Sequence, residues 1–303
     1  MITTEGLTKR YGRVTALEGL SVDVQAGVTG LVGANGAGKS TLLKILLGLL
    51  PATDGTARVL DLDVRVDGPA IRERVGYMPE HDCLPPDVTA TEFCVHMGRM
   101  SGLPATAARE RTADVLRHVG LYEERYRPMG GYSTGMKQRV KLAQALVHDP
   151  GLVLLDEPTN GLDPAGREDM LGLIRRIGAE FGISVLVTSH LLGELERICD
   201  GIVVIDGGQL LQHSTTASVT AETAVVAVEV DGDPTALAAR LGDRGVGVQR
   251  HGGLLHVDVT DPASYDVVRD AVSELGLGLV RMEQQRHRMT EIFTGSAIGG
   301  GHE

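Results

Sequence analysis

The chain has 303 residues, 42% of them hydrophobic and 3% aromatic, so one large domain or two smaller ones can form around aliphatic cores. Its net charge is −11: −5 up to residue 220 (22 basic, 27 acidic) and −6 beyond it (7 basic, 13 acidic). Neither part offers the basic surface of a nucleic-acid-binding protein, so no nucleic acid is expected as a partner.

The first predicted elements are β-strands. Residues 1–25 alternate apolar and polar side chains, which indicates strands of an antiparallel edge. Residues 27–32 predict a short buried strand, and a helix is expected from Thr41 to Leu47. Between that strand and that helix lies the segment Gly33-Ala34-Asn35-Gly36-Ala37-Gly38-Lys39-Ser40.

This segment fits the phosphate-binding loop pattern G-x-x-x-x-G-K-[ST] at every fixed position. Its glycines let the backbone curl so that N–H groups point at phosphate oxygens, and the helix N-terminus adds partial positive charge. Lys39 can bridge the β- and γ-phosphates of a nucleotide, and Ser40 can ligate Mg²⁺. We expect nucleotide contacts from Gly33 to Thr41. The alternative is an accidental match in a glycine-rich turn, which the flanking strand and helix disfavour.

Short strands and then helices are predicted after this loop. Residues 56–80 predict short strands around a turn at Asp67-Gly68-Pro69. Residues 87–127 predict helices with a break at 101–104, and residues 133–148 predict an amphipathic helix with Ser133 as its N-cap. A helical subdomain is therefore expected over about residues 87–148.

A second chemical signal follows the predicted strand Leu152–Leu155, which ends in Asp156 and Glu157. A buried strand can aim Asp156 at the Mg²⁺ of a bound nucleotide, and Glu157 can accept a proton from, or orient, an attacking water. A merely capped strand end is the alternative, but the phosphate loop favours the nucleotide interpretation. The next elements, which argue for a largely parallel sheet wrapped by helices, are a helix over 165–180, a strand over 183–188, a helix over 191–198 and a strand over 201–205.

The composition changes after about residue 215, where Ala, Gly, Val and Asp dominate. The predicted order is βαββαβ, the ferredoxin-like split βαβ pattern. Its elements are expected at residues 225–230, 234–241, 246–250, 254–259, 263–275 and 277–282. We therefore expect a domain over residues 1–215, an accessory domain over 216–294 and a flexible tail over 295–303.

The cysteines and the hydropathy pattern indicate a cellular compartment. Cys83, Cys94 and Cys199 have no metal-type spacing and are odd in number, as expected of free thiols in a reducing compartment. No apolar run approaches the ~18 residues of a membrane span, and the N-terminus lacks a signal pattern. The chain is expected to be cytoplasmic without direct membrane insertion, so that any membrane is reached through a partner.

Three further segments follow the phosphate loop in order. They are Tyr132-Ser133-Thr134-Gly135-Met136-Lys137-Gln138-Arg139, then Leu155-Asp156-Glu157-Pro158-Thr159-Asn160-Gly161-Leu162-Asp163, and then Thr188-Ser189-His190. Over roughly residues 1–215 the chain resembles the ATP-binding-cassette (ABC) ATPases. The resemblance implies a P-loop α/β cassette, with a parallel core sheet, an antiparallel edge subdomain and a helical subdomain, ahead of the small α+β ferredoxin-like domain. It also implies ATP and Mg²⁺ as cofactors.

The resemblance assigns roles to matching positions. Tyr11 matches the aromatic residue that stacks on adenine, and His190 matches the histidine that contacts the γ-phosphate. Ser133 and Gly135 match signature residues that bind the γ-phosphate held by the opposite subunit, and Asp163 matches the loop that links the two sites. The alternatives are an ordinary surface tyrosine for Tyr11 and a helix-capping residue for His190.

Two departures from the family pattern are present. Glu80 stands where the family has the Gln that contacts Mg²⁺ and senses the transport partner. The usual signature is Leu-Ser-Gly-Gly-Gln, whereas this chain has Tyr132, Thr134 and Met136 at the first, third and fifth positions. Both variants are similar to those in the ATPase subunits of bacterial type-2 exporters.

The expected protein is thus an ATPase subunit with Lys39, Glu157 and His190 as catalytic residues. Two copies, or one copy and a homologous ATPase, would close head-to-tail on two ATPs and drive integral membrane permease subunits. The subunit would lie on the inner face of the cell membrane through that permease. The alternatives are a soluble, non-transport ABC ATPase and a nucleotide-binding regulator; the presence of Glu157 and His190 argues against the regulator.

Overall fold

The computed structural model describes residues 1–215, 225–251, 254–259 and 263–284. The chain divides into two compact units, Met1–Thr216 and Ala217–Glu303. Each unit has its own hydrophobic core.

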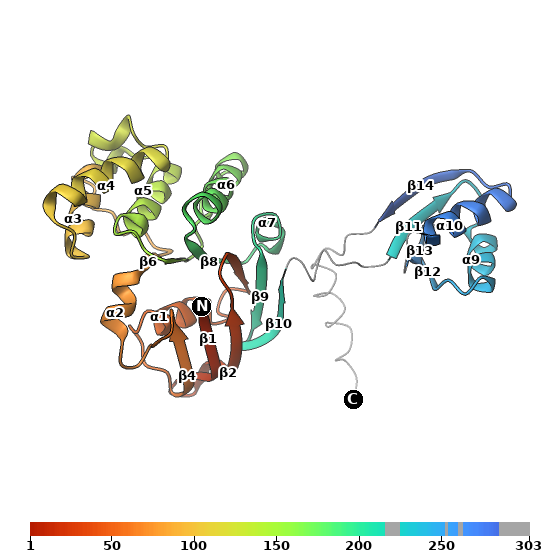
Figure 1. Cartoon of the computed structure of the whole chain (residues 1–303), viewed down its shortest axis with the longest axis horizontal. Helices are drawn as coiled ribbons and strands as arrows, with labels where there is room; N and C mark the ends of the chain where they lie inside the picture. The colour runs from red at the N-terminus through yellow and green to blue at the C-terminus, as the bar shows by residue number, and fades with distance from the viewer. Residues whose placement is uncertain (216–224, 252–253, 260–262, 285–303) are drawn as a thin grey trace. The chain divides into compact units, whose positions relative to one another are not determined.

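An antiparallel sheet opens the first unit (Figure 1). Its strands, in the spatial order β2-β1-β4-β5, are β1 (Ile2–Tyr11), β2 (Val14–Val24), β4 (Asp54–Val59) and β5 (Leu62–Asp63). The predicted antiparallel strands are confirmed, because β1 pairs with β2 on one side and with β4 on the other. Both sides of β1 are therefore occupied, and these strands make a sheet of their own.

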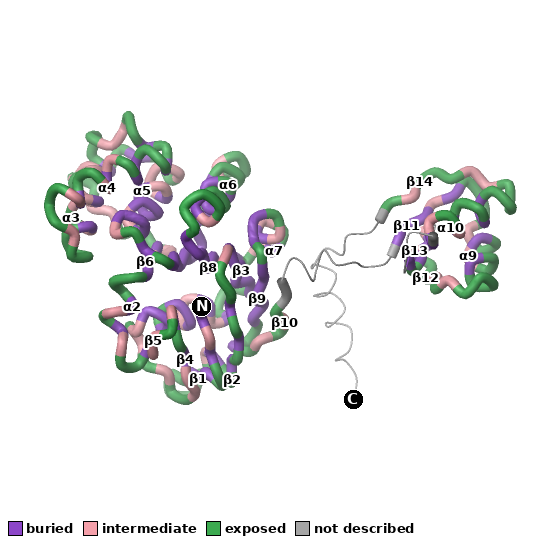
Figure 2. The backbone as a smooth tube through the Cα atoms, viewed as in Figure 1, coloured by how far each residue is buried: buried purple, intermediate pink, exposed green. Residues whose placement is uncertain are grey.

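The second sheet of this unit is mostly parallel. Its strands, in the spatial order β10-β9-β3-β8-β7-β6, are β3 (Val28–Val32), β6 (Val75–Met78), β7 (Leu152–Leu155), β8 (Ser184–Ser189), β9 (Gly201–Asp206) and β10 (Gln209–Thr215). Strands β3, β7 and β8 are buried along their whole length (Figure 2). The four residues of β7 are all aliphatic, whereas β3 and β8 also contain Thr, Ser or Gly. The residues that follow β3, β7 and β8 lie at one edge of the sheet, because parallel strands end on the same side.

Helices complete the first unit. Figure 1 shows α3, α4 and α5 gathered together, and these three helices contact one another. The predicted break between the first two is confirmed, since α3 ends at Met100 and α4 begins at Ala105. The helices of the unit are α1 (Lys39–Leu46), α2 (Gly68–Arg74), α3 (Ala90–Met100), α4 (Ala105–His118), η1 (Glu124–Tyr126), η2 (Met129–Gly131), α5 (Thr134–Leu146), α6 (Pro164–Phe181) and α7 (Leu192–Leu195).

One local prediction is wrong. The turn predicted at residues 67–69 is the start of α2, with Asp67 as its N-cap residue. Pro69 lies in the first helical turn, where its missing N–H removes no intrahelical hydrogen bond. Ile71 then packs into the core and is fully buried, so tertiary burial favours a helix over an isolated turn.

The second unit confirms the ferredoxin-like order. In its described part the sheet has the spatial order β12-β13-β11-β14, and all its pairs are antiparallel. Apolar side chains of β11 and β13 pack with those of the two helices in one cluster. The elements are β11 (Val225–Val230), α9 (Pro234–Asp243), β12 (Val248–His251), β13 (Leu254–Asp258), α10 (Ala263–Glu274) and β14 (Leu279–Gln284).

No helix in the described ranges of either unit is long and apolar enough to span a lipid bilayer.

Candidate functional site

The loop between β3 and α1 is held in a tight conformation. Gly36 and Gly38 have φ values of 87° and 103°, in the left-handed region that favours glycine. A Cβ atom at Gly33 would lie 2.5 Å from the carbonyl oxygen of Ile205, and one at Gly38 would lie 2.4 Å from that of Ala16. Gly33 is therefore required by its close backbone contact, Gly36 is favoured by its φ, and Gly38 is required on both grounds.

Lys39, the first residue of α1, is folded back into this loop. Its side chain is buried, and its Nζ atom donates to the carbonyl oxygens of Gly33 at 2.6 Å and Ala34 at 3.3 Å. The same Nζ lies 3.2 Å from Glu157 Oε1. The ammonium group thus contacts oxygen atoms that nucleotide phosphates can replace.

Asp156 and Glu157 directly follow β7, and both are buried. The hydroxyl group of Thr188, at the end of β8, donates to Asp156 Oδ1 at 2.9 Å and accepts the Glu157 N–H at 2.9 Å. Glu157 has a φ of 49°, a left-handed conformation that is unfavourable for a non-glycine residue. Thr188 therefore holds the Asp156 carboxylate and the Glu157 backbone. The sequence analysis gave this threonine no role, although it lies two residues before His190.

His190 follows β8 and faces the same carboxylate. Its Nδ1 atom lies 2.9 Å from Glu157 Oε2, and its side chain is 45% exposed. The N-cap residue of α7 is Leu191, so His190 does not cap that helix. The two oxygens of Glu157 consequently face Lys39 on one side and His190 on the other.

A cavity of about 270 Å³ opens in front of these groups. It brings together the phosphate loop, Glu80 and Glu157, which the sequence analysis selected from three separate segments. Its lining residues are Ala16, Ala34, Asn35, Gly36, Gly38, Lys39, Ser40, Thr41, Glu80 and Glu157.

Glu80 is held by two residues that the sequence analysis did not assign to the site. Its Oε1 atom lies 3.4 Å from Asn160 Nδ2, and its backbone carbonyl accepts from Lys141 Nζ at 2.7 Å. Lys141 lies on α5 and is only 2% exposed. Burial lowers the pKa of Lys141, and neighbouring acidic groups, among them Asp82 and Glu80, oppose that shift. Only the packing of α5 shows this contact, so no sequence pattern could have found it.

Comparison with known proteins decides the family. Residues 17–160 match the family model described as ABC transporter. The chain is 34% identical to the daunorubicin/doxorubicin resistance ATP-binding protein DrrA of Streptomyces peucetius, over 92% of each chain. The chain belongs to the ABC transporter family. It is an ATP-binding and ATP-hydrolysing subunit, and its cassette fold is that of an ABC ATPase.

Two further comparisons, one with a sequence relative and one with a solved structure, point to the same family. The Nod factor export ATP-binding protein I of Ralstonia nicotianae is 37% identical, over 86% of this chain and 82% of that protein. A solved dimeric bacterial ABC transporter cassette superposes with a TM-score of 0.65 at 25% identity, covering 71% of this chain and 99% of that one. The cassette and the family identification therefore rest on sequence and on structure.

The signature residues Ser133 and Gly135 and the linking-loop residue Asp163 do not line the loop cavity of their own chain. Ser133 is the N-cap of α5 and accepts the Met136 N–H at 3.3 Å. Asp163 is the N-cap of α6 and accepts the Gly166 N–H at 3.0 Å. Ser133 and Asp163 are exposed and Gly135 is half-buried, so all three are open to contact from outside.

Tyr11, at the end of β1, is 46% exposed and does not line the cavity. The Nζ atom of Lys9 lies 5.2 Å from its ring centre. The ring of Tyr11 is exposed on the cassette surface and is therefore accessible for stacking on a purine base.

The residues predicted to ligate Mg²⁺ supply only oxygen atoms, which suits a hard cation. These are the Ser40 hydroxyl and the carboxylates of Glu80 and Asp156. No group of three or more His, Cys, Asp or Glu side chains in the described ranges is arranged to hold a metal ion alone.

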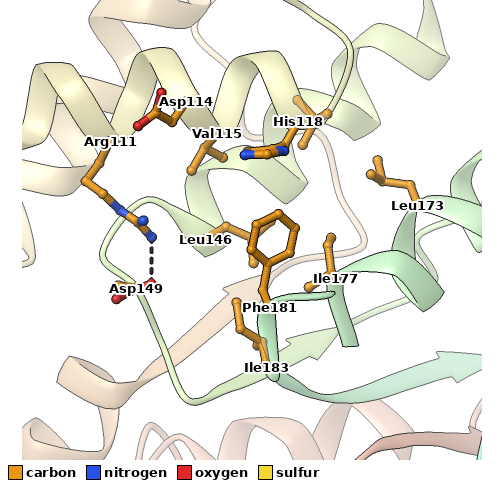
Figure 3. A pocket seen from close by; sticks show the side chains of 11 residues that line it. Arg111, Asp114, Val115, His118, Leu146, Asp149, Leu173, Ile177, Phe181 and Ile183 are labelled. Atoms are coloured by element: carbon orange, nitrogen blue, oxygen red, sulfur yellow. Dashed lines mark hydrogen bonds and ion pairs between the residues drawn. The ribbon is translucent and has the colours of Figure 1, made fainter. Parts of the chain in front are cut away.

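A second cavity of the ABC ATPase, about 120 Å³, lies between α4, α5 and α6 (Figure 3). Figure 3 shows Phe181 and His118 side by side, and their ring centres are 4.8 Å apart. Arg111 forms an ion pair with Asp149 at 2.7 Å on its border. Its lining includes none of the phosphate-loop residues, which line the loop cavity instead.

Proposed function

We propose that this ABC ATPase drives export through a separate integral membrane permease and works on the cytoplasmic face of the cell membrane. Two relatives carry drug resistance or Nod factor export in their names, which supports export as the direction. The observation that carries the catalytic part is Glu157, whose carboxylate lies 3.2 Å from Lys39 and 2.9 Å from His190 beside the loop cavity.

In this proposal ATP displaces Lys39 from the loop carbonyls and from Glu157. The ammonium group then contacts the β- and γ-phosphates, while the loop N–H groups hold their oxygens. Glu157, released from Lys39, accepts a proton from the water that attacks the γ-phosphorus, and His190 contacts the γ-phosphate. Ser40, Glu80 and Asp156 would hold Mg²⁺, which neutralises phosphate charge when bound.

The signature residues Ser133 and Gly135 act on the ATP held by a second copy of the chain or by a homologous ATPase, and Asp163 lies in the loop that links the two sites. Ser133, Gly135 and Asp163 are open to contact but lie outside the lining of their own chain's cavity. A head-to-tail pair lets Ser133 of one chain face the phosphates bound by the other. The dimeric form of a related solved cassette supports the pairing of two cassettes.

We also propose which part of the chain forms the cassette and which part forms the accessory domain. The first unit, up to about residue 215, is the cassette, with residues 87–148 as its helical subdomain. The second unit, over residues 216–294, is an accessory domain with a core of its own.

Replacing Glu157 by Gln tests the proposal. The variant should bind ATP as tightly as the wild type, because the phosphate loop is intact, and should hydrolyse it at least about 100-fold more slowly. Nucleotide titration and phosphate release measure the two effects. The matched control is Glu168→Gln, at an exposed carboxylate of α6 that pairs with Arg197. Hydrolysis by Glu157→Gln at the rate of the control would contradict the assigned role.

A further inference from the structure

The loop cavity has an unfavourable charge balance for an anionic ligand. Two carboxylates, those of Glu80 and Glu157, line it, and Lys39 supplies a cation from the loop. Asp156, the predicted metal ligand, adds a third carboxylate next to Glu157. A triphosphate entering this cavity meets repulsion that Lys39 must offset while also contacting the phosphates.

A buried ammonium group lies behind the acidic side of this cavity. Lys141 projects from α5, is 2% exposed, and donates to the backbone carbonyl of Glu80 at 2.7 Å. It interacts electrostatically with the carboxylates of Glu80, Asp82 and Asp156. Charge interactions at such a buried position are weakly screened by solvent.

The burial of Lys141 is costly by itself. Moving an ammonium group out of water is unfavourable unless opposite charges and hydrogen bonds compensate for it. One carbonyl oxygen satisfies one of its three N–H donors. The carboxylates of Asp82, Glu80 and Asp156 favour the charged form of Lys141 and partly offset the effect of burial, and the cation in turn reduces their negative potential at the cavity.

We infer that Lys141 is a positioning residue of the ATP site: it offsets the negative charge of Glu80 and holds the Glu80 backbone at the cavity wall. The inference rests on the proposed ATP site. It assigns Glu80 and Lys141 as a coupled pair, so the cost of losing the lysine depends on the carboxylate.

A double-mutant cycle tests this coupling in the full-length chain. Affinity for Mg²⁺·ATP is measured by equilibrium titration with a fluorescent ATP analogue for Lys141→Met, for Glu80→Gln and for the double variant. Lys141→Met should weaken binding about tenfold when Glu80 is present and about twofold or less in the Glu80→Gln background. Thermal unfolding of each variant reports whether the chain is folded.

Two further variants test whether the effect comes from the charge of Lys141. One keeps a hydrogen-bond donor without the charge, and the other removes a different lysine of α5. Lys141→Gln keeps a donor for the Glu80 carbonyl but lacks the charge, so it should bind as weakly as Lys141→Met. Lys137→Met removes a lysine one turn earlier on α5, where it pairs with Asp82 and is partly exposed, and should change affinity less than about twofold.

The outcomes are distinct. An equal loss of affinity from Lys141→Met with and without the Glu80 carboxylate would show a purely structural role and overturn the inference, as would wild-type affinity in Lys141→Gln. If either of these two results is found and the wild-type chain binds and hydrolyses ATP, the proposed function stands although this inference fails. A wild-type chain without ATP binding would overturn both.

Discussion

At the residue scale, Glu157 contacts both Lys39 and His190 beside the loop cavity. Its carboxylate contacts an ammonium group and an imidazole, and its backbone is held at a φ of 49° by Thr188. Such a backbone conformation is kept only where surrounding contacts fix it. The backbone contact with Thr188 thus helps to place the Glu157 carboxylate between Lys39 and His190.

The three cysteines give a prediction at this scale. Burial raises the pKa of Cys94 and of Cys199 to about 12. Partial burial also raises the pKa of Cys83, but Cys83 is the exposed thiol of the three. At pH 8 a soluble thiol reagent should therefore label Cys83 alone in the folded chain, because the buried thiols carry almost no thiolate and are inaccessible.

Mass spectrometry of labelled peptides measures this pattern, and labelling in denaturant is the control in which all three thiols react. Labelling of Cys94 at the rate of Cys83 in the folded chain would contradict the burial that the structure gives it. Cys83 lies in the segment after β6 that carries Glu80, so its labelling rate with and without ATP also reports on that segment.

Individual site residues could be predicted when their own motif carries the chemistry. Lys39, Asp156 and Glu157 stand in fixed patterns, so their proximity follows from parallel strands that end at one edge of the sheet. Lys141 and Thr188 could not be assigned in this way. Their roles depend on which atoms they meet across α5 and β8, and side-chain patterns along the sequence do not specify such contacts.

At the element scale, helix α3 is fixed by a capping box. The Thr89 hydroxyl accepts the Glu92 N–H at 3.2 Å, and Glu92 Oε2 accepts the Thr89 N–H at 3.0 Å. Thr89→Ala should lower the free energy of unfolding of the first unit by about 1 kcal/mol, because N–H groups at the helix start lose their acceptor.

Urea unfolding followed by circular dichroism measures this loss. The control is Thr106→Ala, at an exposed position inside α4, which should change stability by less than about 0.5 kcal/mol. Equal effects at the two threonines would show that the capping box adds nothing beyond helix propensity.

Elements with a local cause were predicted, and those with a distant cause were not. Ser133 caps α5, and Pro104 precedes α4, in agreement with the sequence patterns. The Asp67-Gly68-Pro69 segment suits a turn or a helix start equally well, and burial of Ile71 decides for the helix. The antiparallel sheet was expected, but its pairing of β1 with β4, more than 40 residues away, was not specified by the sequence patterns.

At the scale of the whole molecule, the head-to-tail pair predicts a defect in trans. Ser133→Arg should leave ATP binding by the single chain unchanged, since Ser133 lies outside its own cavity. It should abolish hydrolysis, because the arginine blocks the signature from the phosphates held by the second chain. Nucleotide titration and phosphate release measure the two effects, and Ser101→Arg, at an exposed serine after α3, controls for the added charge and bulk. Normal hydrolysis by Ser133→Arg at saturating ATP would contradict the head-to-tail dimer.

The second unit supports a prediction about assembly. It closes its own core around Leu237, Leu255 and Val268, and it carries six net negative charges beyond residue 220. It is therefore a poor binder of anionic lipid or nucleic acid. Its edge strand β14 exposes Val280, 61% accessible, and an edge with an exposed apolar residue is a site where another strand can pair.

A chain truncated after Thr216 should consequently keep the ATP affinity of the full-length chain but dimerise more weakly. Light scattering in the presence of ATP measures dimerisation. The Glu157→Gln background is used so that ATP hydrolysis does not dissociate the dimer. Val280→Lys in the full-length chain is the matched variant: if β14 pairs between subunits, the charge should weaken the dimer as truncation does, without removing the unit.

Loss of ATP binding in a truncated chain that remains folded would contradict the accessory role. An insoluble truncated chain would instead indicate that the second unit covers apolar surface of the cassette, because truncation would then expose that surface to water.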